Sequence, residues 1–572
     1  MNKTKKKIII IACVLVVVLL FMAIAPFLFR WPYKNFDPPV ADMKPDFDLS
    51  SMLLQYKIEG EDFTVTGAGK INLKSIKVAN MYFGMPITNV GAGAFAGNST
   101  VQKVVLPETV KRISHNAFAN CAALETISVP NSVTNISATA FAGCTSLKYN
   151  EYENALYLGN DANPYHALIK VVDTSVSEFV VHSGATVFAD SAFAGCDDIE
   201  TITFKGSVIP RYKFSELASL TTILTEAPVV YLPEESFRDC EHLETVDLGD
   251  SLVTIGSYAF AGCKSLKEFN IPSTVTTIGK GVFTNCASIV DITIPESATS
   301  IGAALFSGCS SLESVTLPSN MTVIGESFFS GCSSLNGVTI PESVTTIGKS
   351  AFTGCASLTG ITIPAAVTSI GDSAFSNCSG LVSITIPESV TAIANSTFSG
   401  CASLESVVLP ATLKTIGNRV FYGCESLVEI SLPDSITAVG NTAFDKCNSL
   451  VFSEYDNAYY LGNESNPYLV LIKAKSDSDD VKVESCVVHE NTKVIAANAF
   501  ASCKNLTSIT ISASVKNMGE KIFDGCTKFT TINYDGTMED WKSVSKHGKW
   551  DDKLKTYTIH CTDGDIVKEE KK

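Results

Sequence analysis

Residues 335–355 read Leu-Asn-Gly-Val-Thr-Ile-Pro-Glu-Ser-Val-Thr-Thr-Ile-Gly-Lys-Ser-Ala-Phe-Thr-Gly-Cys, and this unit decides the fold. Its closing frame, Phe-x-x-Cys-x-x-(Leu/Ile/Phe), contains fifteen of the eighteen cysteines, and ten of them, from Cys240 to Cys447, recur at every twenty-third position. A fixed period of this length is typical of units that cannot bury an apolar face alone and must stack on their neighbours. The sequence therefore predicts a repeat solenoid rather than a globule.

The period also holds where the cysteine is replaced. Asn98 stands one full period before Cys121, and Leu217 stands one full period before Cys240, each with a phenylalanine three residues earlier. With these two units the frame predicts about 17 units of twenty-three residues.

Each unit is expected to contain two short strands. In the unit quoted above, Val338 and Ile340 alternate as inward-facing strand residues do, and Pro341 then ends the strand because it cannot donate to a ladder. Val344 and Ile347 indicate a second short strand. Copies stacked in successive units would form narrow parallel sheets, with about 4.8 Å per unit and about 80 Å in all.

A turn is expected after the second strand. Gly348 supplies the backbone freedom for it. The segment Ala351-Phe352-x-x-Cys355 is predicted to form a single helical or 3₁₀ turn that buries the phenylalanine ring. The expected product is an elongated solenoid with broad faces.

The repeated pattern Leu-x-x-Ile-x-Ile-Pro-x-Ser-Val-Thr-x-Ile-Gly-x-x-Ala-Phe-x-x-Cys resembles the BspA-type, or Treponema-type, leucine-rich repeat of bacterial surface proteins. The resemblance implies a leucine-rich repeat solenoid over residues 91–529. It also implies surface adhesion or interaction with host and microbial proteins, and no catalysis. The same repeat serves many partners, so the resemblance does not name a ligand.

Both flanks of the repeats resemble the ends of this family. Residues 56–90, which include Phe63-Thr-Val-Thr-Gly, resemble the N-terminal cap that precedes the first repeat. Residues 530–572 resemble the C-terminal closure through Tyr534-Asp-Gly-Thr-Met-Glu-Asp-Trp541, and they end in a mixed-charge tail. We therefore expect a cap at each end of the solenoid.

The N-terminus has the pattern of a membrane anchor. Residues 1–7 carry four lysines, and the segment 8–29 that follows contains no charge. At about 1.5 Å per residue this segment would reach roughly 33 Å, against a hydrocarbon core of about 30 Å. The lysines predict a cytoplasmic N-terminus and extracellular repeats, and residues 30–55 are expected to form a short spacer.

A cleaved signal peptide is the alternative, because Ala23-Ile24-Ala25 has the small-residue spacing of a cleavage site. Pro26 directly follows that site, and the apolar run is longer than a usual signal core. We therefore favour an uncleaved, single-pass anchor in the cell membrane. The sequence alone leaves both the cleavage and the oligomeric state open.

The repeated cysteines are expected to be buried thiols. One cysteine per unit, at a constant distance from a buried phenylalanine, is typical of a small apolar residue in a stacked core. Asn98 and Leu217 at the same position argue against obligatory pairing or metal ligation, and the sequence has no zinc-binding spacing. Cys13 lies in the apolar segment, and the pairing of Cys486 and Cys561 stays open.

Two inserts, near residues 149–178 and 452–485, interrupt the period and are copies of each other. Each contains Ala-x-Tyr-Leu-Gly and Tyr-x-x-Leu-Ile-Lys around an Asn-Pro turn, which predicts a hairpin. Inserts in solenoids map to one face, often the binding face, and tyrosine is a favoured interface anchor. These rings either bind a partner or pack their own hairpin onto the sheet edge. The candidate binding residues are Tyr152, Tyr157, Tyr165, Tyr455, Tyr459, Tyr460 and Tyr468.

A column of threonines forms a second candidate binding surface on the first strand of each unit. Threonine suits an exposed strand position, so solubility and strand propensity are one interpretation. The other is a flat adhesive face that acts through many weak contacts. Its members are Thr293, Thr316, Thr339, Thr362 and Thr385, and the column is interrupted by Val408 and resumed by Ser431.

Catalysis and nucleic-acid binding are both disfavoured. The net charge is -16 and no basic stripe with interleaved aromatic residues occurs, so nucleic acid is not expected as a partner. No hydrolase, phosphate-binding or dinucleotide motif is present, and Asp563-Gly-Asp565 is too short for a calcium loop, so we expect no enzyme, cofactor or metal. We interpret the histidines as scattered, without a repeated position; they are His115, His166, His182, His242, His489, His547 and His560.

Two functional hypotheses follow. The first is a membrane-anchored surface protein that mediates adhesion or binds an extracellular protein or glycan. The second is a structural or spacer protein of the cell envelope without a ligand of its own. The sequence does not identify the ligand.

Overall fold

The computed structural model describes residues 50–569, except 61, 69–71, 213, 476–481 and 553. The chain divides into two compact units, Met1–Phe47 and Asp48–Lys572. The first unit lies outside the described residues, and with it the predicted anchor at residues 8–29. Among the described residues, no helix is both long enough and apolar enough to cross a membrane.

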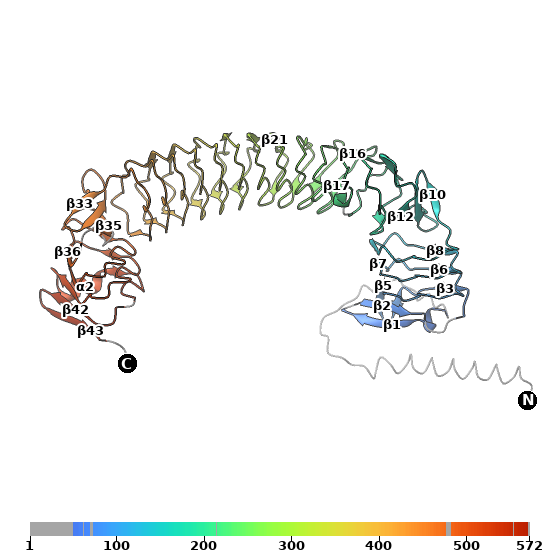
Figure 1. The fold of residues 1–572 in the computed structure, drawn as a ribbon, viewed down its shortest axis with the longest axis horizontal. Helices are drawn as coiled ribbons and strands as arrows, with labels where there is room; N and C mark the ends of the chain where they lie inside the picture. The colour runs from blue at the N-terminus through green and yellow to red at the C-terminus, as the bar shows by residue number, and fades with distance from the viewer. Residues whose placement is uncertain are drawn as a thin grey trace, which may run out of the picture. The chain divides into compact units, whose positions relative to one another are not determined.

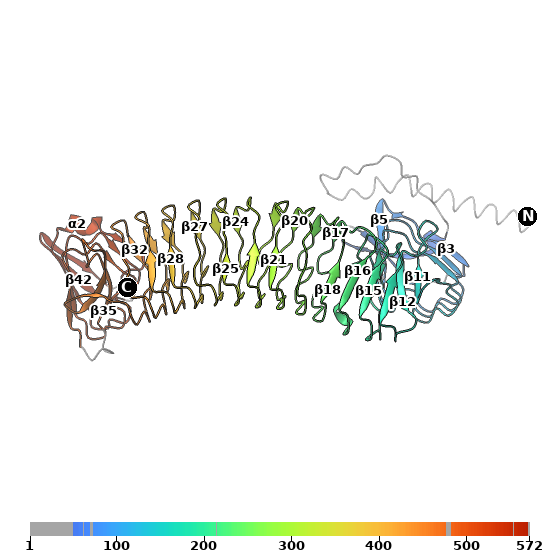
Figure 2. The ribbon, with the colours of Figure 1, turned by 90° about the horizontal axis from the view of Figure 1, so that it is seen from above.

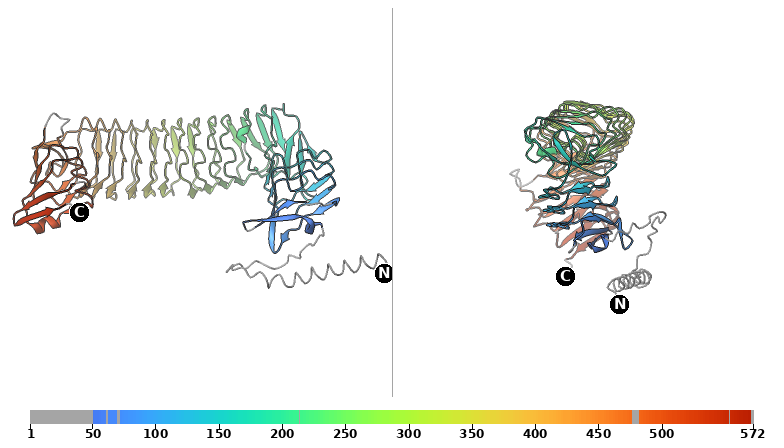
Figure 3. Two further views of the ribbon diagram at one scale, coloured as in Figure 1. Left: turned by 60° about the horizontal axis from the view of Figure 1, so that its bottom comes forward. Right: turned by 90° about the vertical axis from the view of Figure 1, so that its right-hand side faces the viewer.

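The second unit is a β-solenoid of about 21 turns of about 23 residues. Figure 1 and Figure 3 show the turns as a row of repeated coils within this unit. The solenoid prediction is confirmed. The predicted number of units, about 17, is lower than the observed number of turns because the prediction counts only coils that contain the phenylalanine frame. The inserts and the two ends of the repeats add further coils.

Every regular coil has two strand positions, as predicted, on opposite sides of the coil (Figure 1). We call the strands before and after the conserved proline position the first and second strands. The first strands are β3 (Ser75–Lys77), β6 (Lys103–Val105), β8 (Thr126–Ser128), β13 (Glu178–Val181), β15 (Thr201–Phe204), β16 (Thr222–Thr225), β18 (Thr245–Asp247), β21 (Asp291–Thr293), β23 (Ser314–Thr316), β25 (Gly337–Val338), β28 (Ser383–Thr385), β30 (Ser406–Val408), β36 (Ser485–Val487), β38 (Ser508–Ile511), β40 (Thr531–Tyr534) and β42 (Tyr557–Cys561).

The second strands form the other set of ladders. They are β2 (Asp62–Gly67), β5 (Met85–Val90), β7 (Arg112–Ile113), β9 (Asn135–Ile136), β14 (Val187–Phe188), β17 (Tyr231–Leu232), β19 (Thr254–Ile255), β20 (Thr277–Ile278), β22 (Ser300–Ile301), β24 (Val323–Ile324), β26 (Thr346–Ile347), β27 (Ser369–Ile370), β29 (Ala392–Ile393), β31 (Thr415–Ile416), β32 (Ala438–Val439), β37 (Val494–Ile495), β39 (Asn517–Met518) and β41 (Ser545–Lys546).

Neighbouring coils pair in parallel, one full period apart. Ser314, Val315 and Thr316 of β23 lie opposite Asp291, Ile292 and Thr293 of β21, and Ile347 of β26 lies opposite Ile324 of β24 and Ile370 of β27. Because both ladders keep the same register, every inward residue stacks on its copy. Figure 2 shows successive coils with their strands side by side.

The core is a stack of identical side chains. Phe352 lies 5.2 Å from Phe329 and 5.1 Å from Phe375, measured between ring centroids, with the rings stacked. Leu335, Val344 and Ile347 are fully buried in the same coil, as the alternation predicts. Stacked rings at this spacing add to the energy of apolar burial.

The repeated cysteines are buried free thiols that connect the coils. Cys378 Sγ donates to the carbonyl oxygen of Phe352 at 3.1 Å, and Cys355 Sγ donates to that of Phe329 at 3.3 Å. Burial raises the pKa of Cys378 to about 12, which keeps the thiol protonated and unreactive.

The expected helical or 3₁₀ turn is wrong for the regular coils. Among the described residues at the phenylalanine frame of each coil, only η2 (Phe214–Glu216) forms a 3₁₀ helix. In the coil formed by residues 335–355, Ser350 and Gly354 have φ of 55° and 76°, and they lie on either side of Phe352. Two left-handed residues so close together stop a right-handed helix from propagating, so the chain makes consecutive β-turns instead.

Gly348 is needed for close approach rather than for a positive φ. A Cβ there would lie 2.8 Å from the backbone nitrogen of Glu326 in the preceding coil. The same kind of contact recurs at other glycines of this column, such as Gly302 and Gly371. The glycine column therefore lets successive turns nest against each other.

Both ends of the described unit carry antiparallel strands. β1 (Gln55–Glu59) pairs with β2, and β4 (Met81–Tyr82) pairs with β5, after the short 3₁₀ helix η1 (Ser51–Leu53). At the other end β43 (Gly564–Lys568) pairs with β42. The helix α2 (Met538–Ser543) starts at a capping box between Thr537 and Asp540 and buries Trp541.

Candidate functional site

The inserts form hairpins, as predicted, but the hairpins are part of the stack. In the first insert β10 (Asn150–Tyr152), β11 (Ala155–Leu158) and β12 (Ala167–Val171) pair in an antiparallel sheet, and β12 then pairs in parallel with β14. In the second insert β33 (Ser453–Tyr455), β34 (Ala458–Leu461) and β35 (Val470–Ala474) do the same, and β35 pairs with β37. Each insert therefore supplies an additional coil.

Each insert gathers an aromatic cluster of three tyrosines and one histidine. We call them the first cluster (Tyr152, Tyr157, Tyr165, His182) and the second cluster (Tyr455, Tyr460, Tyr468, His489). In the first, the ring of Tyr165 stacks on His182 with centroids 3.9 Å apart, and Tyr152 meets His182 edge-on at 4.7 Å. In the second, Tyr468 stacks on His489 at 3.8 Å, and Tyr455 meets His489 at 4.7 Å.

One tyrosine of each cluster is completely buried. Tyr157 and Tyr460 both have an exposed fraction of 0 %. Each hydroxyl accepts a hydrogen bond from the backbone N–H of the cluster histidine, at 3.4 Å in the first cluster and 3.3 Å in the second. Burial raises the pKa of Tyr157 to about 12. These two candidate residues cannot touch a partner in the folded chain, and they pack their hairpin onto the solenoid.

The other candidate tyrosines are more accessible. Tyr152, Tyr165, Tyr459 and Tyr468 are half-buried, whereas Tyr455 is 41 % exposed. Tyr459 lies outside the second cluster, beside Phe452, with Lys473 and Lys475 near its ring. Only Tyr455 therefore offers a large accessible surface.

The sequence did not reveal the cluster histidines, and the interpretation that no histidine is repeated is wrong for this pair. His182 and His489 each stand at the fourteenth position before a frame cysteine, Cys196 or Cys503, which is the signal that would have found them. Each Nδ1 accepts a backbone N–H two residues later, at 2.9 Å from Gly184 and 3.1 Å from Asn491. Because the inserts differ in length, the two histidines stand at different distances from the start of their inserts. Their equivalence is seen only when the distance is counted back from the frame cysteine.

The threonine column is exposed along its entire length. Thr293, Thr316, Thr339, Thr362 and Thr385 are all solvent-accessible, and they stand on successive coils. The neighbouring outward column is also exposed; Asp291 stands beside Thr293, and the four residues that follow are small, namely Ser314, Gly337, Gly360 and Ser383. From the coil of Thr316 to that of Thr385, these two columns form a polar surface without large side chains, between Asp291 on one side and the exposed Val408 on the other.

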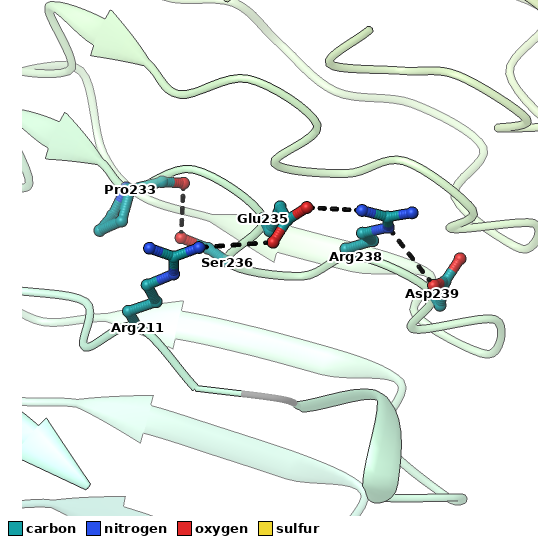
Figure 4. Close-up of polar contacts among 6 residues, drawn as sticks. All are labelled: Arg211, Pro233, Glu235, Ser236, Arg238 and Asp239. Atoms are coloured by element: carbon teal, nitrogen blue, oxygen red, sulfur yellow. Dashed lines mark hydrogen bonds and ion pairs between the residues drawn. The ribbon is translucent and has the colours of Figure 1, made fainter. Parts of the chain in front are cut away.

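Charged contacts link coils elsewhere without forming a site. Figure 4 shows Arg211 reaching Glu235 of the next unit at 3.5 Å, and Arg238 contacting both Glu235 and Asp239. Arg211 and Arg238 are mostly solvent-exposed, so these ion pairs contribute little to stability. Among the described residues, no group of three or more histidine, cysteine or acidic side chains is placed to hold a metal ion.

Comparison with known proteins identifies the repeat. The sequence profile described as "BspA type Leucine rich repeat region (6 copies)" matches residues 69–168, 171–289, 230–359, 327–451 and 472–545. This profile describes a repeat scaffold, and no catalytic family is indicated. A search of curated proteins finds no match.

Solved structures with similar repeats come from several bacteria. A leucine-rich repeat protein from Bacteroides ovatus is 23% identical, with 90% of this chain and 99% of that chain covered and a TM-score of 0.31. A leucine rich cell surface protein from Faecalibacterium prausnitzii is 21% identical, with 88% and 98% covered and a TM-score of 0.28. A leucine rich repeat protein of T. pallidum is 20% identical, with 38% and 90% covered and a TM-score of 0.20.

Proposed function

The chain belongs to the BspA-type leucine-rich repeat family, and from this premise we propose that it is a surface interaction protein that binds an extracellular protein or glycan. Its proposed contact surface is the flat side of the first strands that carries the threonine column. The proposed location is the outer face of a cell membrane, with residues 8–29 as the anchor and the N-terminus in the cytoplasm.

The observation that carries this proposal is the exposure of five threonines in one register. Their coils repeat at roughly the spacing of paired strands, about 4.8 Å, so a long partner could touch many equivalent groups at once. Each hydroxyl can donate and accept a hydrogen bond, and weak contacts that are linked together add up to a firm attachment. A flat surface without large side chains suits an extended partner better than a small ligand.

The aromatic clusters are a secondary candidate surface. Tyr455 supports this alternative through its exposure, because tyrosine anchors often dominate binding energy. The packing of the other rings against histidine and hairpin supports a structural role for most of each cluster. The inserts would then position the two ends of the contact surface.

A binding assay with substituted threonines tests the proposal. Wild-type full chain is screened against immobilised matrix proteins, serum proteins and glycans, beside a variant that carries Thr316→Lys, Thr339→Lys and Thr362→Lys. The control carries Thr322→Lys, Thr345→Lys and Thr368→Lys, which are exposed residues beside the second strands on the same coils. Saturable binding that only the first variant loses would support the threonine surface.

Other outcomes select between the remaining hypotheses. Binding that survives in both lysine variants but is lost in Tyr455→Ala would move the site to the second cluster. Absence of any binding, together with envelope defects when the gene is deleted, would support a spacer role instead. The proposed anchor is tested separately, by asking whether the protein stays in the membrane fraction after alkaline extraction and loses its repeats to external protease.

A further inference from the structure

The end of the described unit that carries β1 presents a cluster of aromatic and aliphatic side chains. Figure 1 shows β1 as the outermost strand at this end of the row of coils. The ring of Tyr82 lies 4.3 Å from Tyr56, 5.2 Å from Phe63 and 4.6 Å from Phe83, measured between centroids. Ile58 of β1 lies opposite Phe63 of β2 in the antiparallel ladder, so it belongs to the same cluster. Ile58 and Phe83 are 54 % and 76 % exposed.

The two ends of the unit differ in this respect. Among the described residues from 50 to 90, Leu53 and Met81 are exposed in addition to Ile58 and Phe83. Among the described residues from 531 to 569, Val567 is the only large apolar side chain that is exposed. Single exposed apolar residues are normal, but several of them together mark a surface that contacts a partner or a membrane.

Phe83 is also an unusual residue for its position in the chain. Tyr82 of β4 pairs with Met85 of β5, so Phe83 and Gly84 form a two-residue hairpin turn, with φ of 49° and 81°. Asparagine and glycine favour such a turn, whereas a bulky residue with a positive φ is strained. Because most of the Phe83 side chain is exposed, packing within the chain does not offset this strain. A strained residue of this kind indicates a function outside the folding of its own turn.

The length of chain before the described unit places a membrane within reach of this end. Ser50 is the first described residue and the proposed anchor ends at residue 29, so residues 30–49 join the two. A segment of this length spans at most about 70 Å. No other part of the described unit follows the proposed anchor so closely in the chain.

The charge of this end suits contact with lipid headgroups. Residues 50–90 contain four lysines and three acidic residues, although the chain as a whole has a net charge of -16. Lys57, Lys74 and Lys77 are exposed. Lysines are attracted to anionic lipids, and tyrosine rings favour the boundary between lipid and water.

We propose that the β1 end of the unit lies against the phospholipid surface of the membrane that holds the chain, with the side chains of Phe83 and Ile58 inserted among the headgroups. This contact rests on the membrane anchor proposed above and adds a second attachment to it. So few apolar side chains bind lipid weakly alone, but the anchor keeps them at a high effective concentration beside the bilayer. Two attachments fix the direction in which the solenoid leaves the membrane, whereas the anchor alone would leave it free to pivot.

Fluorescence quenching by brominated lipids tests this contact. The full chain is reconstituted, at a high ratio of lipid to protein, into vesicles of phosphatidylcholine and phosphatidylglycerol with brominated acyl chains. Phe83→Trp places an indole in the proposed contact. The control is Val451→Trp, because Val451 is 71 % exposed on a coil far along the row. The emission of the wild-type chain, which contains Trp31, Trp541 and Trp550, is subtracted from both.

We expect the emission added by Phe83→Trp to shift to shorter wavelength in vesicles and to lose intensity when the lipid is brominated. The emission added by Val451→Trp should show neither change. Ile58→Trp provides a second reporter, and its quenching should fall when Phe83→Asn is added, because the aromatic insertion is then lost. Phe83→Asn introduces a residue that the turn favours, so its thermal unfolding should not occur below that of the wild-type chain.

Four results would overturn the proposal. Release of the chain from the vesicles by alkaline extraction would remove the anchor and, with it, this contact. Retention of the chain without quenching at position 83 would remove the contact and leave the anchor standing. Equal quenching at positions 83 and 451 would mean that the solenoid lies on lipid without a specific end. A shift at position 83 that needs a high protein concentration and is insensitive to bromine would mean that a second copy of the chain covers the cluster.

Discussion

The first insert and the second insert fold alike but differ at several buried positions, and one of these exchanges a polar side chain for an apolar one. His166 in the first insert corresponds to Leu469 in the second, and both side chains are almost completely buried. His166 Nε2 lies 3.1 Å from the carbonyl oxygen of Val133 and Nδ1 lies 2.8 Å from the hydroxyl of Thr186. A core position can thus exchange leucine for histidine when both ring nitrogens have partners.

The comparison teaches that the hairpin is specified by its shared tyrosines and glycines rather than by every buried residue. The shared features are the buried Tyr157 and Tyr460, and the turn glycines Gly159 and Gly462. The distinguishing features include His166 and, beside the first cluster, Lys205, whose counterpart in the second copy is Ser512. Predictions can therefore be made for both copies together or for one alone.

The largest effect is expected from removing the buried ring. Tyr157→Ala and Tyr460→Ala should each lower the free energy of unfolding of their insert by about 3–5 kcal/mol, because each leaves a cavity under the hairpin. Hydrogen exchange across each insert measures the local loss. Tyr455→Ala is the control, since Tyr455 is partly exposed; a loss as large as that of Tyr460→Ala would contradict the structural role assigned to the buried rings.

A smaller effect, again equal in the two copies, is expected at the turn glycines. A Cβ at Gly159 would lie 2.0 Å from the carbonyl oxygen of Asn163, and one at Gly462 would lie 1.9 Å from that of Asn466. Gly159→Ala and Gly462→Ala should each cost about 1–3 kcal/mol through forced displacement of the turn. Thermal unfolding of both variants measures it, and a change in only one copy would break the equivalence of the hairpins.

A pH effect is expected in the first insert. Burial lowers the pKa of His166 below its ordinary value of 6.5, so the folded chain binds fewer protons than the unfolded chain. The stability that neutral His166 provides is complete above pH 6.5 and is lost as the pH falls from there toward the lowered pKa. Hydrogen exchange at pH 7.5 and pH 5, corrected for intrinsic rates, should show a loosened first insert at the lower pH.

His166→Leu, which copies Leu469, should reduce this pH dependence. Some dependence should remain, because burial and the charge of Lys205 also lower the pKa of His182. An unchanged pH profile in His166→Leu would mean that His166 is not the group responsible.

The smallest effect is expected from Lys205→Ser, which copies Ser512. Lys205 is only half-buried, so a change in unfolding smaller than those above is expected. The pKa of His182 should nevertheless rise, because one of the two causes that lower it is removed. Titration of the His182 ring by NMR measures this, and a fall or no change in its pKa would contradict the placement of Lys205 beside the first cluster.

The family and the solenoid could be predicted because every regular coil repeats the same pattern of residues. The inward alternation of Val338 and Ile340 and the constant spacing from Phe352 to Cys355 recur many times, so the shared pattern outweighs local exceptions. The hairpins of the inserts were predictable for the same reason, because two copies preserve the same residues. The threonine column was visible in the sequence, and the structure places it at the surface.

The site could be predicted only in part, because burial of a single ring depends on its neighbours in other coils. The sequence gives no sign that Tyr455 and Tyr460 differ in burial. In the structure Tyr455 is exposed, whereas Tyr460 packs beneath the hairpin. The pairing of His182 with its tyrosines joins residues from different strands, and a count along one insert does not show it. The turn after the second strand was predicted incorrectly because its left-handed positions are occupied by different residue types in different coils. No single residue type beside Phe352 therefore indicates a positive φ.

The sequence by itself determined the period, the identity of the stacked core and the family, because a parallel stack requires each inward residue to meet its own copy. Tertiary structure decided which tyrosines are accessible and left the ring of Phe83 exposed at the end of the unit that carries β1. The physical reason is that a period specifies contacts between equivalent positions. Accessibility and backbone pairing, by contrast, depend on how each particular coil fits against the two coils beside it.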